Sequence, residues 1–410
     1  MNILHISFSD GNGGAAIAAL RLHEAMSSSN IESRMLVFDK TNKQSTIFQL
    51  NTRWNKKINQ VYHNTFYRIT KYVFKPLYAF ELGLVGSKIS KSSLVKWADV
   101  IYIHWCGFSF LSIKEIQCIL KTNKTVFLYM HDMWYITGGC HHSFECKKYE
   151  TGCNNCHLIQ RKFFSNIVSS VLRRKIKSWN YNNLAVITPS NWLGTCTKNS
   201  LLFQYKNIHI IPNLIDSKIF KPLNRTFAKE ILNLDVNKFY ICFGAIGGSQ
   251  NKFKGWSYFV EALKYVEKSD NIEIILFGGY ILDEEIKKIP FKVHQLGHLF
   301  DKYTLAAMYS ACNVYILPSL AENLPQTMME ALSCGAVGVG FNIGGMPDLI
   351  KHKQTGYLAK YQDSRDLGEG INWAKNNCSI SVIEQHQFIE KSFGIQRILQ
   401  KHMQLWSTKK

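Results

Sequence analysis

Two glutamates, Glu322 and Glu330, follow a short apolar run in the second half of this 410-residue chain. The apolar run, residues 314–317, predicts a buried parallel strand, because such strands are covered on both faces. Glu322 then falls on the loop beyond the carboxyl end of that strand. Pro325 has the fixed φ of a first helical turn, and the pattern of residues 327–332 predicts a helix with Glu330 about two turns into it. Backbone N–H groups at such a helix start bind anions, so the flanking carboxylates could hold the hydroxyls of a sugar and a ribose.

Apolar runs alternate with helical patterns along the chain. The runs that predict strands are residues 1–8, 34–38, 98–105, 125–130 and 184–190 in the first half, and 239–244, 272–279, 314–317 and the run before Gly344 in the second. Strands that alternate with helices form parallel, doubly wound sheets. A chain of this length is long enough for two or three domains. The sequence therefore predicts an α/β protein with such a sheet in each half.

Composition and charge limit the class of protein. Hydrophobic residues make up 46% of the chain and charged residues 19%, which is typical of a globular protein. No stretch approaches the roughly 20 apolar residues of a membrane span, and residues 1–8 predict a strand without the basic lead of a signal peptide. The expected location is the cytoplasm. The net charge of +20 indicates a polyanionic partner, which charge alone leaves open between nucleic acid, an anionic membrane face and phosphorylated substrates.

The segment from Pro318 to Leu332 resembles the E-x7-E signature of the retaining glycosyltransferases of family 4. Residues 344–348 and 355–358 follow in the family's order, as a Gly-rich turn before a short helix and then a closing strand. The resemblance covers essentially the whole chain. It implies the GT-B architecture, in which two facing Rossmann-like doubly wound domains have a cleft between them.

The resemblance also implies domain limits. An N-terminal, acceptor-side domain is expected at residues 1–211, and a C-terminal, nucleotide-sugar-binding domain at residues 212–391. A helix at about residues 392–410 is expected to cross back to the first domain, as in GT-B relatives.

Residues of the donor site follow from the same resemblance. Lys254 matches the family's lysine that pairs with donor phosphate, a task that suits a point charge. The family pattern has an arginine a few residues earlier, near Ser249, where Lys252 is the candidate substitute. Glu330 is expected on the donor ribose and Glu322 beside the transferred sugar or its phosphate. The expected donor-binding residues of this domain are Lys254, Asn323, Leu324, Pro325, Gln326 and Glu330.

The first half offers two further candidates. Gly13 and Gly14 lack side chains at a predicted strand-to-helix turn, so the backbone could approach a pyrophosphate there. His131 projects from the carboxyl end of the predicted strand 125–130, where ligands of α/β sheets bind. Family members often place a histidine here against the transferred sugar, whereas a lone histidine after a strand is otherwise more often structural. His131 and Glu322 are the expected catalytic residues, and the family's front-face mechanism implies that the donor phosphate itself accepts the proton.

Four of the eleven cysteines form a cluster with the spacing C-x5-C-x6-C-x2-C. Thiolates at this density predict one structural zinc ion, with a histidine ligand in place of one cysteine or reduced thiols as alternatives. The expected ligands are Cys140, Cys146, Cys153 and Cys156. The seven other cysteines are expected to be buried thiols, because a cytosolic chain of this size does not depend on a disulfide framework. With no D-x-D motif in the sequence, no catalytic metal is expected.

Residues 51–97 mix aromatic and basic side chains, which suits a membrane interface or a lipid-linked acceptor. Equally, a helix here could pack its aromatic side chains on the domain and leave its lysines solvated. The side chains concerned are Trp54, Lys56, Lys57, Tyr62, Phe66, Tyr67, Arg68, Lys71, Tyr72, Phe74 and Lys75.

The predicted function is the transfer of a sugar, with retention, from a nucleotide-diphosphate sugar to a lipid-linked saccharide. The product would be a bacterial O-antigen or capsule, made by an enzyme bound peripherally at the inner, anionic face of the cell membrane. One alternative is a basic, zinc-containing nucleic-acid-binding protein, but the basic residues are dispersed and no nucleic-acid-binding module is present, so no nucleic-acid partner is expected. Another alternative is a GT-B epimerase that acts on the nucleotide sugar alone.

Overall fold

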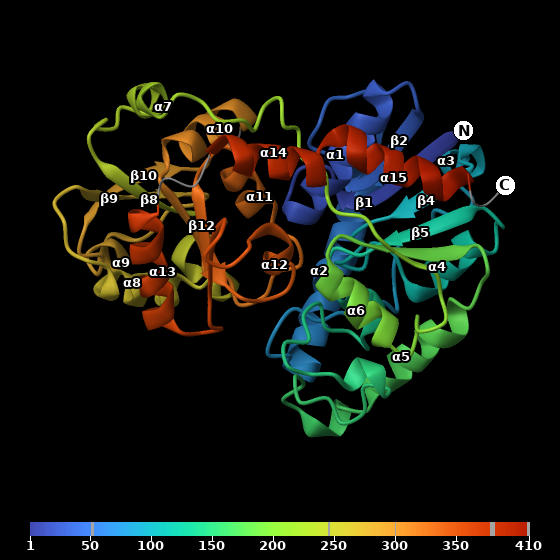
Figure 1. Cartoon of the computed structure of the whole chain (residues 1–410). Coiled ribbons are helices and arrows are strands. Elements are labelled where there is room, and N and C mark those ends of the chain that lie inside the picture. The colour runs from blue at the N-terminus through green and yellow to red at the C-terminus, as the bar shows by residue number, and fades with distance from the viewer. Residues whose placement is uncertain (51–52, 245–246, 300, 378–381, 408–410) are drawn as a thin grey trace. The chain divides into compact units, whose positions relative to one another are not determined.

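The computed structural model describes residues 1–50, 53–244, 247–299, 301–377 and 382–407, and within 53–66 it describes side chains only for residues 61, 64 and 65. The chain divides into two compact units, Met1–Pro212 (unit 1) and Asn213–Lys410 (unit 2). Each unit contains a twisted sheet with helices packed around it (Figure 1). The predicted domain limits, including the helix that crosses back, stay a prediction.

Unit 1 is built on a parallel sheet with the strand order β3-β2-β1-β4-β5-β6-β7 in its described residues. The strands are β1 (Asn2–Ser9), β2 (Glu32–Asp39), β3 (Ile47–Gln49), β4 (Val100–Ile103), β5 (Thr125–Tyr129), β6 (Leu184–Thr188) and β7 (Ile208–Ile210). The helices are α1 (Gly14–Ser28), α2 (Arg53–Phe74), α3 (Ser93–Trp97), α4 (Ile113–Leu120), α5 (Ile167–Ser178) and α6 (Asn191–Asn199), with 3-10 turns η1 (Trp134–Ile136), η2 (Lys148–Glu150) and η3 (Lys162–Phe164).

Unit 2 is built on a second parallel sheet, ordered β10-β9-β8-β11-β12-β13 in its described residues. The strands are β8 (Phe239–Gly244), β9 (Ile272–Phe277), β10 (Lys292–Gly297), β11 (Val314–Leu317), β12 (Val337–Phe341) and β13 (Gly356–Ala359). The α-helices are α7 (Arg225–Ile231), α8 (Trp256–Ala262), α9 (Asp283–Ile286), α10 (Lys302–Ala311), α11 (Gln326–Ser333), α12 (Met346–Leu349), α13 (Ser364–Asn376), α14 (Val382–Phe393) and α15 (Ile395–Ser407). The 3-10 turns are η4 (Gly248–Gln250), η5 (Lys252–Lys254) and η6 (Leu263–Tyr265).

Both faces of the second sheet are buried, as the apolar runs predict. Successive residues of β8 enter different cores: Tyr240 and Cys242 pack in one, and Ile241 and Phe243 pack in the other. This alternation follows from the two-residue period of a strand. The prediction of doubly wound parallel sheets is confirmed in both units.

The strand order reverses once in each sheet, and the reversal marks where ligands bind in this class of fold. In unit 1, β1 lies between β2 and β4. In unit 2, β8 lies between β9 and β11. A ligand site is therefore expected on the loops that follow β1, β4, β8 and β11.

The expectation that the scattered cysteines are all thiols is wrong for one pair. Cys242 of β8 and Cys312, which follows α10, are joined as a disulfide. The two residues are 70 positions apart in sequence, but the fold brings their Cα atoms to 6.1 Å, within the range that a disulfide spans. The sequence carries no signal for this proximity, because it depends on how α10 packs beside the sheet.

Candidate functional site

Three loops of unit 2 meet at the carboxyl ends of neighbouring strands. They follow β8, β11 and β12, which lie side by side in the sheet. The loop after β8 carries Lys254, the loop after β11 carries Glu322, and the loop after β12 carries the pair Gly344-Gly345. The structure thus brings together the residues that the sequence assigns to the donor site of this domain.

Lys254 and Glu322 form an ion pair with 2.6 Å between Lys254 Nζ and Glu322 Oε1. The side chain of Lys254 is 30% exposed and that of Glu322 is 13% exposed, so solvent screens the pair only in part. Lys252, the candidate substitute for the family arginine, has an exposed side chain. Lys254 is therefore the lysine of this turn that the structure directs at Glu322.

Two backbone contacts hold the lysine loop against the glutamate loop. Gly255 has a left-handed φ of 71°, and a side chain there would run into the carbonyl oxygen of Pro318. The backbone N–H of Leu320 donates to the carbonyl oxygen of Phe253 at 2.8 Å. Because only glycine allows this approach, the Lys-Gly sequence has a structural reason as well as a functional one.

The glycine pair after β12 packs against the glutamate loop on the side opposite the lysine loop. Gly344 has a left-handed φ of 51°, and a side chain there would collide with the carbonyl oxygen of Glu322. The backbone N–H of Gly345 donates to the carbonyl oxygen of Asn323 at 2.6 Å. The backbone of Glu322 is therefore fixed from two directions, which gives its carboxylate a defined position.

The helix between the two glutamates begins one residue before the predicted range, 327–332. Its first residue is Gln326, and Pro325 is the N-cap with an extended ψ of 118°. Glu330 is consequently the fifth helical residue, just over one turn from the start and not two. Asn323, Leu324 and Gln326 are buried beside this helix start, where backbone N–H groups favour a phosphate.

Glu330 is buried among side chains that can donate to it. Burial, and then the carboxylate of Glu330, raise the pKa of Tyr309 well above its usual value. The phenol of Tyr309 therefore stays protonated as a hydrogen-bond donor. Burial and Glu330 likewise raise the pKa of the Cys334 thiol. A buried carboxylate with such neighbours is a positioned acceptor, which suits the hydroxyl groups of a ribose.

In unit 1, Gly13 and Gly14 lie where the sequence places them, at the turn from β1 into α1. Gly13 is the N-cap with a φ of 92°, and no atom would meet a side chain at either glycine. Asp10 anchors this loop, because its carboxylate accepts hydrogen bonds from the backbone N–H and hydroxyl of Thr41 at 2.7 and 2.8 Å. The start of α1 is thus open and fixed in place.

His131 ends a row of three histidines whose adjacency the sequence does not predict. His104 Nδ1 lies 3.0 Å from His131 Nε2, and His104 Nε2 lies 3.0 Å from His5 Nδ1. The rings stack with centroids 5.3 and 5.2 Å apart. His5 and His104 are fully buried, whereas His131 is half-buried. A signal was present, because each histidine lies on or just after a predicted strand, but their adjacency depends on the strand order β1-β4-β5.

The row sets the chemistry available to His131. Burial lowers the pKa of His131 to about 4, so the ring is neutral near neutral pH. One nitrogen in each hydrogen-bonded pair donates and the other accepts, so the tautomer of His131 is coupled to that of His104. His104 is therefore a positioning residue for His131. A neutral, oriented imidazole can accept from or donate to a sugar hydroxyl.

The cysteine cluster does not form a recognisable metal centre. Cys140, Cys146, Cys153 and Cys156 are all described, yet no group of three or more Cys, His, Asp or Glu side chains able to hold a metal is found among the described residues. Burial raises the pKa of Cys140 to about 12 and that of Cys153 to about 11, so zinc would have to displace their protons. Burial, with a further contribution from the charges of other cysteines of the cluster, raises the pKa of Cys140, Cys153 and Cys156. The four thiols therefore lie close together, and the zinc site stays a prediction.

Comparison with known proteins agrees with the geometry of unit 2. Residues 240–377 match the family model described as "Glycosyl transferases group 1". The chain is similar to the UDP-Gal:alpha-D-GlcNAc-diphosphoundecaprenol alpha-1,3-galactosyltransferase of Escherichia coli, with 31% identity over 38% of this chain and 42% of that protein. It is also similar to an N,N'-diacetylbacillosaminyl-diphospho-undecaprenol alpha-1,3-N-acetylgalactosaminyltransferase of Campylobacter jejuni, with 28% identity over 29% of this chain and 31% of that protein. The matches thus span less than half of either relative.

A solved structure extends the likeness of fold to both units. Anabaena HepE, crystallised with UDP and glucose, superposes with a TM-score of 0.66 at 16% identity over 99% of each chain. The chain therefore has the GT-B fold, which confirms the predicted fold class. The loops described above carry the residues that could serve a transferase on this fold.

The low pKa of His131 predicts a pH-dependent loss of stability. As pH falls below about 6.5, the unfolded chain binds a proton that the folded chain does not accept until about pH 4. The contribution of His131 therefore lowers the free energy of unfolding as pH falls from about 6.5 to about 4, and it causes no further loss below about pH 4. Replacing His131 by Gln should flatten this part of the pH profile, measured by urea unfolding. Replacing the exposed His298 by Gln should leave the profile unchanged, and equal slopes for parent and His131→Gln would contradict the assignment.

Metal analysis tests the cysteine cluster. If the four thiols hold zinc, protein purified without added metal should contain about one zinc ion per chain. Cys153→Ser with Cys156→Ser should remove the metal, whereas Cys118→Ser should not. A zinc content below about a tenth of one equivalent, with the same thermal stability in parent and double variant, would rule out a structural zinc site.

Proposed function

We propose that this chain is a retaining glycosyltransferase that moves a sugar from a nucleotide-diphosphate sugar to a lipid-linked saccharide in the assembly of a bacterial surface polysaccharide. The observation that carries the proposal is the Lys254–Glu322 ion pair, held at the carboxyl ends of β8 and β11. The match of residues 240–377 to group 1 glycosyl transferases supports it, because that segment contains all three converging loops.

In the proposed chemistry, residues of unit 2 stabilise the negative charge of the donor diphosphate. In a front-face transfer the diphosphate leaves and accepts the proton of the attacking hydroxyl, so stabilising its developing charge lowers the barrier. Lys254 would supply a positive charge, and the first backbone N–H groups of α11 would supply hydrogen bonds. Glu322 would lie beside the transferred sugar, and Glu330 would accept from the donor ribose. Anabaena HepE, whose fold this chain shares, was crystallised with UDP and glucose, which makes UDP the first donor nucleotide to test.

The lipid-linked acceptor rests on the relatives. Both curated relatives named above act, by their names, on saccharides joined through diphosphate to undecaprenol. His131 would face the reacting sugar as a neutral imidazole. A transferase of this kind needs the acceptor for turnover, whereas an epimerase would turn over the nucleotide sugar alone.

Lys254→Ala and Glu322→Gln separate donor binding from transfer. Loss of the Lys254 charge should weaken binding of a nucleoside diphosphate by about 10- to 100-fold, the effect of losing roughly 1.5–3 kcal/mol from a charged hydrogen bond. The free nucleoside should bind unchanged. Glu322→Gln should leave diphosphate affinity equal or higher, because Lys254 loses a competing partner, while turnover falls. Lys268→Ala is the matched control, because Lys268 is an exposed lysine of the same unit that precedes β9 at the opposite edge of the sheet; it should change neither property.

The measurement starts from thermal shifts with a panel of nucleotide-diphosphate sugars. The true donor at about 100 times its dissociation constant should stabilise the parent by about 2.7 kcal/mol. Calorimetric titration of the variants with the matching diphosphate and nucleoside then gives the affinities. If Lys254→Ala and Lys268→Ala bind the diphosphate alike, Lys254 does not contact phosphate and the proposed donor site is wrong.

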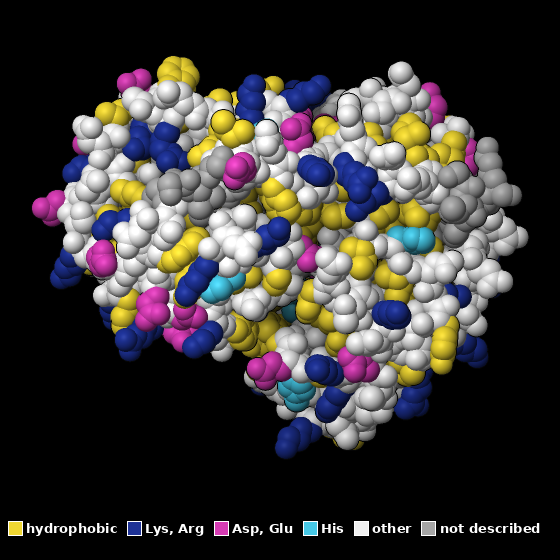
Figure 2. All heavy atoms as spheres, in the orientation of Figure 1, with side chains coloured by type: hydrophobic (Ala, Val, Ile, Leu, Met, Phe, Trp, Pro, Cys, Tyr) yellow, Lys and Arg dark blue, Asp and Glu magenta, His cyan; other side chains and the backbone are white. Residues whose placement is uncertain are grey.

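An enzyme that acts on a lipid-linked acceptor must bind the membrane surface that holds it. We propose that α2 and the residues that follow it make this contact with the anionic bilayer. None of the described helices is long and apolar enough to cross a membrane. On the face that Figure 2 shows, Lys and Arg side chains are scattered over each unit without forming one dense patch. The α2 region adds exposed apolar side chains to basic ones; its exposed residues include Arg68, Ile69, Lys71, Tyr72, Lys75 and Leu77. The predicted contributions of Trp54, Lys56, Lys57, Tyr62 and Phe66 lie outside the described side chains.

Changing Arg68, Lys71 and Lys75 together to Gln should weaken binding to anionic vesicles. Each basic residue near such a surface contributes about 1 kcal/mol, and salt screens the effect. The control changes Lys114, Lys177 and Lys198 to Gln, exposed lysines of the same unit that remove the same charge. Vesicle co-sedimentation at low and high salt measures the difference. Equal binding by the two triple variants would show that α2 is not the membrane contact.

A further inference from the structure

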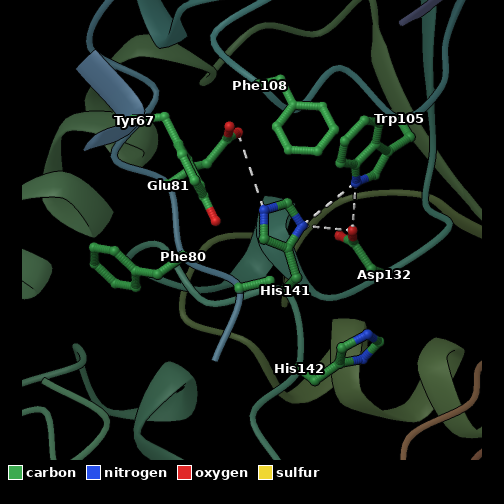
Figure 3. Close-up of a pocket in the computed structure, with 9 residues that line it drawn as sticks. Tyr67, Phe80, Glu81, Trp105, Phe108, Asp132, His141 and His142 are labelled. Atoms are coloured by element: carbon green, nitrogen blue, oxygen red, sulfur yellow. Dashed lines mark hydrogen bonds and ion pairs between the residues drawn. The ribbon is translucent and has the colours of Figure 1, made fainter. Parts of the chain in front are cut away.

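Unit 1 contains a hollow of about 200 Å³ that the donor chemistry does not use (Figure 3). It lies beside the carboxyl ends of β4 and β5, since it is lined by Trp105, which follows β4, and Asp132, which follows β5. One water needs only about 10–15 Å³ by this kind of measure, whereas pockets for drug-sized ligands hold about 300–1,000 Å³. The hollow is therefore of a size for one small ring.

His141 stands at the centre of the polar groups of this hollow (Figure 3). Its Nδ1 lies 2.7 Å from Asp132 Oδ2, and the indole N–H of Trp105 donates to the same oxygen at 2.8 Å. On the other side, His141 Nε2 lies 4.0 Å from Glu81 Oε2. The side chains of His141, Asp132 and Glu81 are almost wholly buried. Burial raises the pKa of Glu81 to about 7, so near neutral pH its carboxyl group can both donate to and accept from a ligand hydroxyl.

One aromatic side chain that lines the hollow, Phe108, lies on a strained turn. Phe108 and Ser109 have left-handed φ values of 54° and 55°, which residues with side chains rarely adopt. The backbone N–H groups of both residues hydrogen-bond the Glu81 carboxyl group. Phe108 is left 40% exposed, edge-on to the ring of Trp105 with centroids 5.0 Å apart and to that of Tyr67 at 6.3 Å. Strain of this kind is typical of ligand-binding positions.

We propose that this hollow binds one sugar ring of the acceptor saccharide, a proposal that rests on the function proposed above. The rings of Trp105, Phe108 and Tyr67 offer apolar surface to the C–H face of a pyranose. The carboxyl groups of Glu81 and Asp132 offer acceptors for its hydroxyls. Apolar walls with a few convergent polar groups are the usual design of a small-molecule site.

Charge favours a neutral ligand over an ion. His141 lies 2.7 Å from the Asp132 carboxylate and compensates its charge, and burial raises the pKa of Glu81 to about 7, so the hollow carries little net charge to attract a phosphate. A cation is disfavoured because each carboxyl group already has donors: Asp132 accepts from Trp105 and from the backbone N–H of Trp134 at 2.8 Å. Lone pairs that remain on such oxygens suit hydroxyl groups, which both donate and accept.

Saturation-transfer NMR on the full chain tests the site without any nucleotide present. The probes are the methyl glycosides of glucose, galactose and N-acetylglucosamine. At least one should receive magnetisation from the parent protein. Phe108→Gly and Glu81→Gln should each weaken that binding by about fivefold or more, the effect of one lost contact or hydrogen bond. Phe108→Gly relieves a left-handed φ but loses ring contacts with Phe8 and Trp105, so the Tm of each variant is measured and binding is compared where both variants are folded, which separates binding from folding.

Tyr205→Ala is the control, since that side chain is 92% exposed on the same unit and does not line the hollow; it should bind like the parent. The proposal is overturned if none of the three glycosides binds the parent, if both pocket variants bind like the parent, or if methylammonium chloride displaces the glycoside. Donor stabilisation without glycoside binding would reject this site alone. Glycoside binding without donor stabilisation would reject the proposed transferase alone.

Discussion

The ion pair between Lys254 and Glu322 is the contact on which the proposed donor site depends. It joins loops 68 residues apart in sequence at 2.6 Å, and the glycines at 255 and 344 let the backbones approach closely enough to form it. Because Lys254 is already oriented, its side chain needs little rearrangement to bind a phosphate. Glu322 at the same time competes for that charge, so donor binding must loosen the pair or share it.

The candidate site residues of unit 1 carry less net charge than Lys254 of unit 2. His131 is kept neutral by burial and oriented through His104, so it can contact a sugar without adding charge. In the neighbouring hollow, burial alone would raise the pKa of Asp132, but His141 beside it holds the pKa below its usual value. The strand ends of unit 1 thus offer neutral or internally compensated groups, which suit hydroxyls, whereas unit 2 offers a partly exposed cation, which suits a diphosphate.

The sequence predicts the central strands well, because strands covered on both faces are apolar throughout. It misses β3, β7 and β10, which lie toward the edges of their sheets; β10 is a half-exposed strand of mixed polarity, and the other two are short. The sequence places Glu322 correctly on its loop, but it places Glu330 about two turns into the helix, whereas Glu330 is the fifth residue of a helix that begins at Gln326. The residue pattern places each histidine of the row on or just after a strand, but their adjacency depends on the strand order β1-β4-β5. The left-handed Phe108 and the Cys242–Cys312 link depend on loop conformation and helix packing, for which residue patterns carry no signal.

A crystal structure of the protein with its nucleoside diphosphate would show whether Lys254 contacts phosphate. We expect the terminal phosphate within hydrogen-bonding distance of Lys254 Nζ and of the backbone N–H groups at the start of α11, with a Lys254–Glu322 distance longer than 2.6 Å. A diphosphate bound elsewhere, with that pair unchanged, would contradict the proposed donor site.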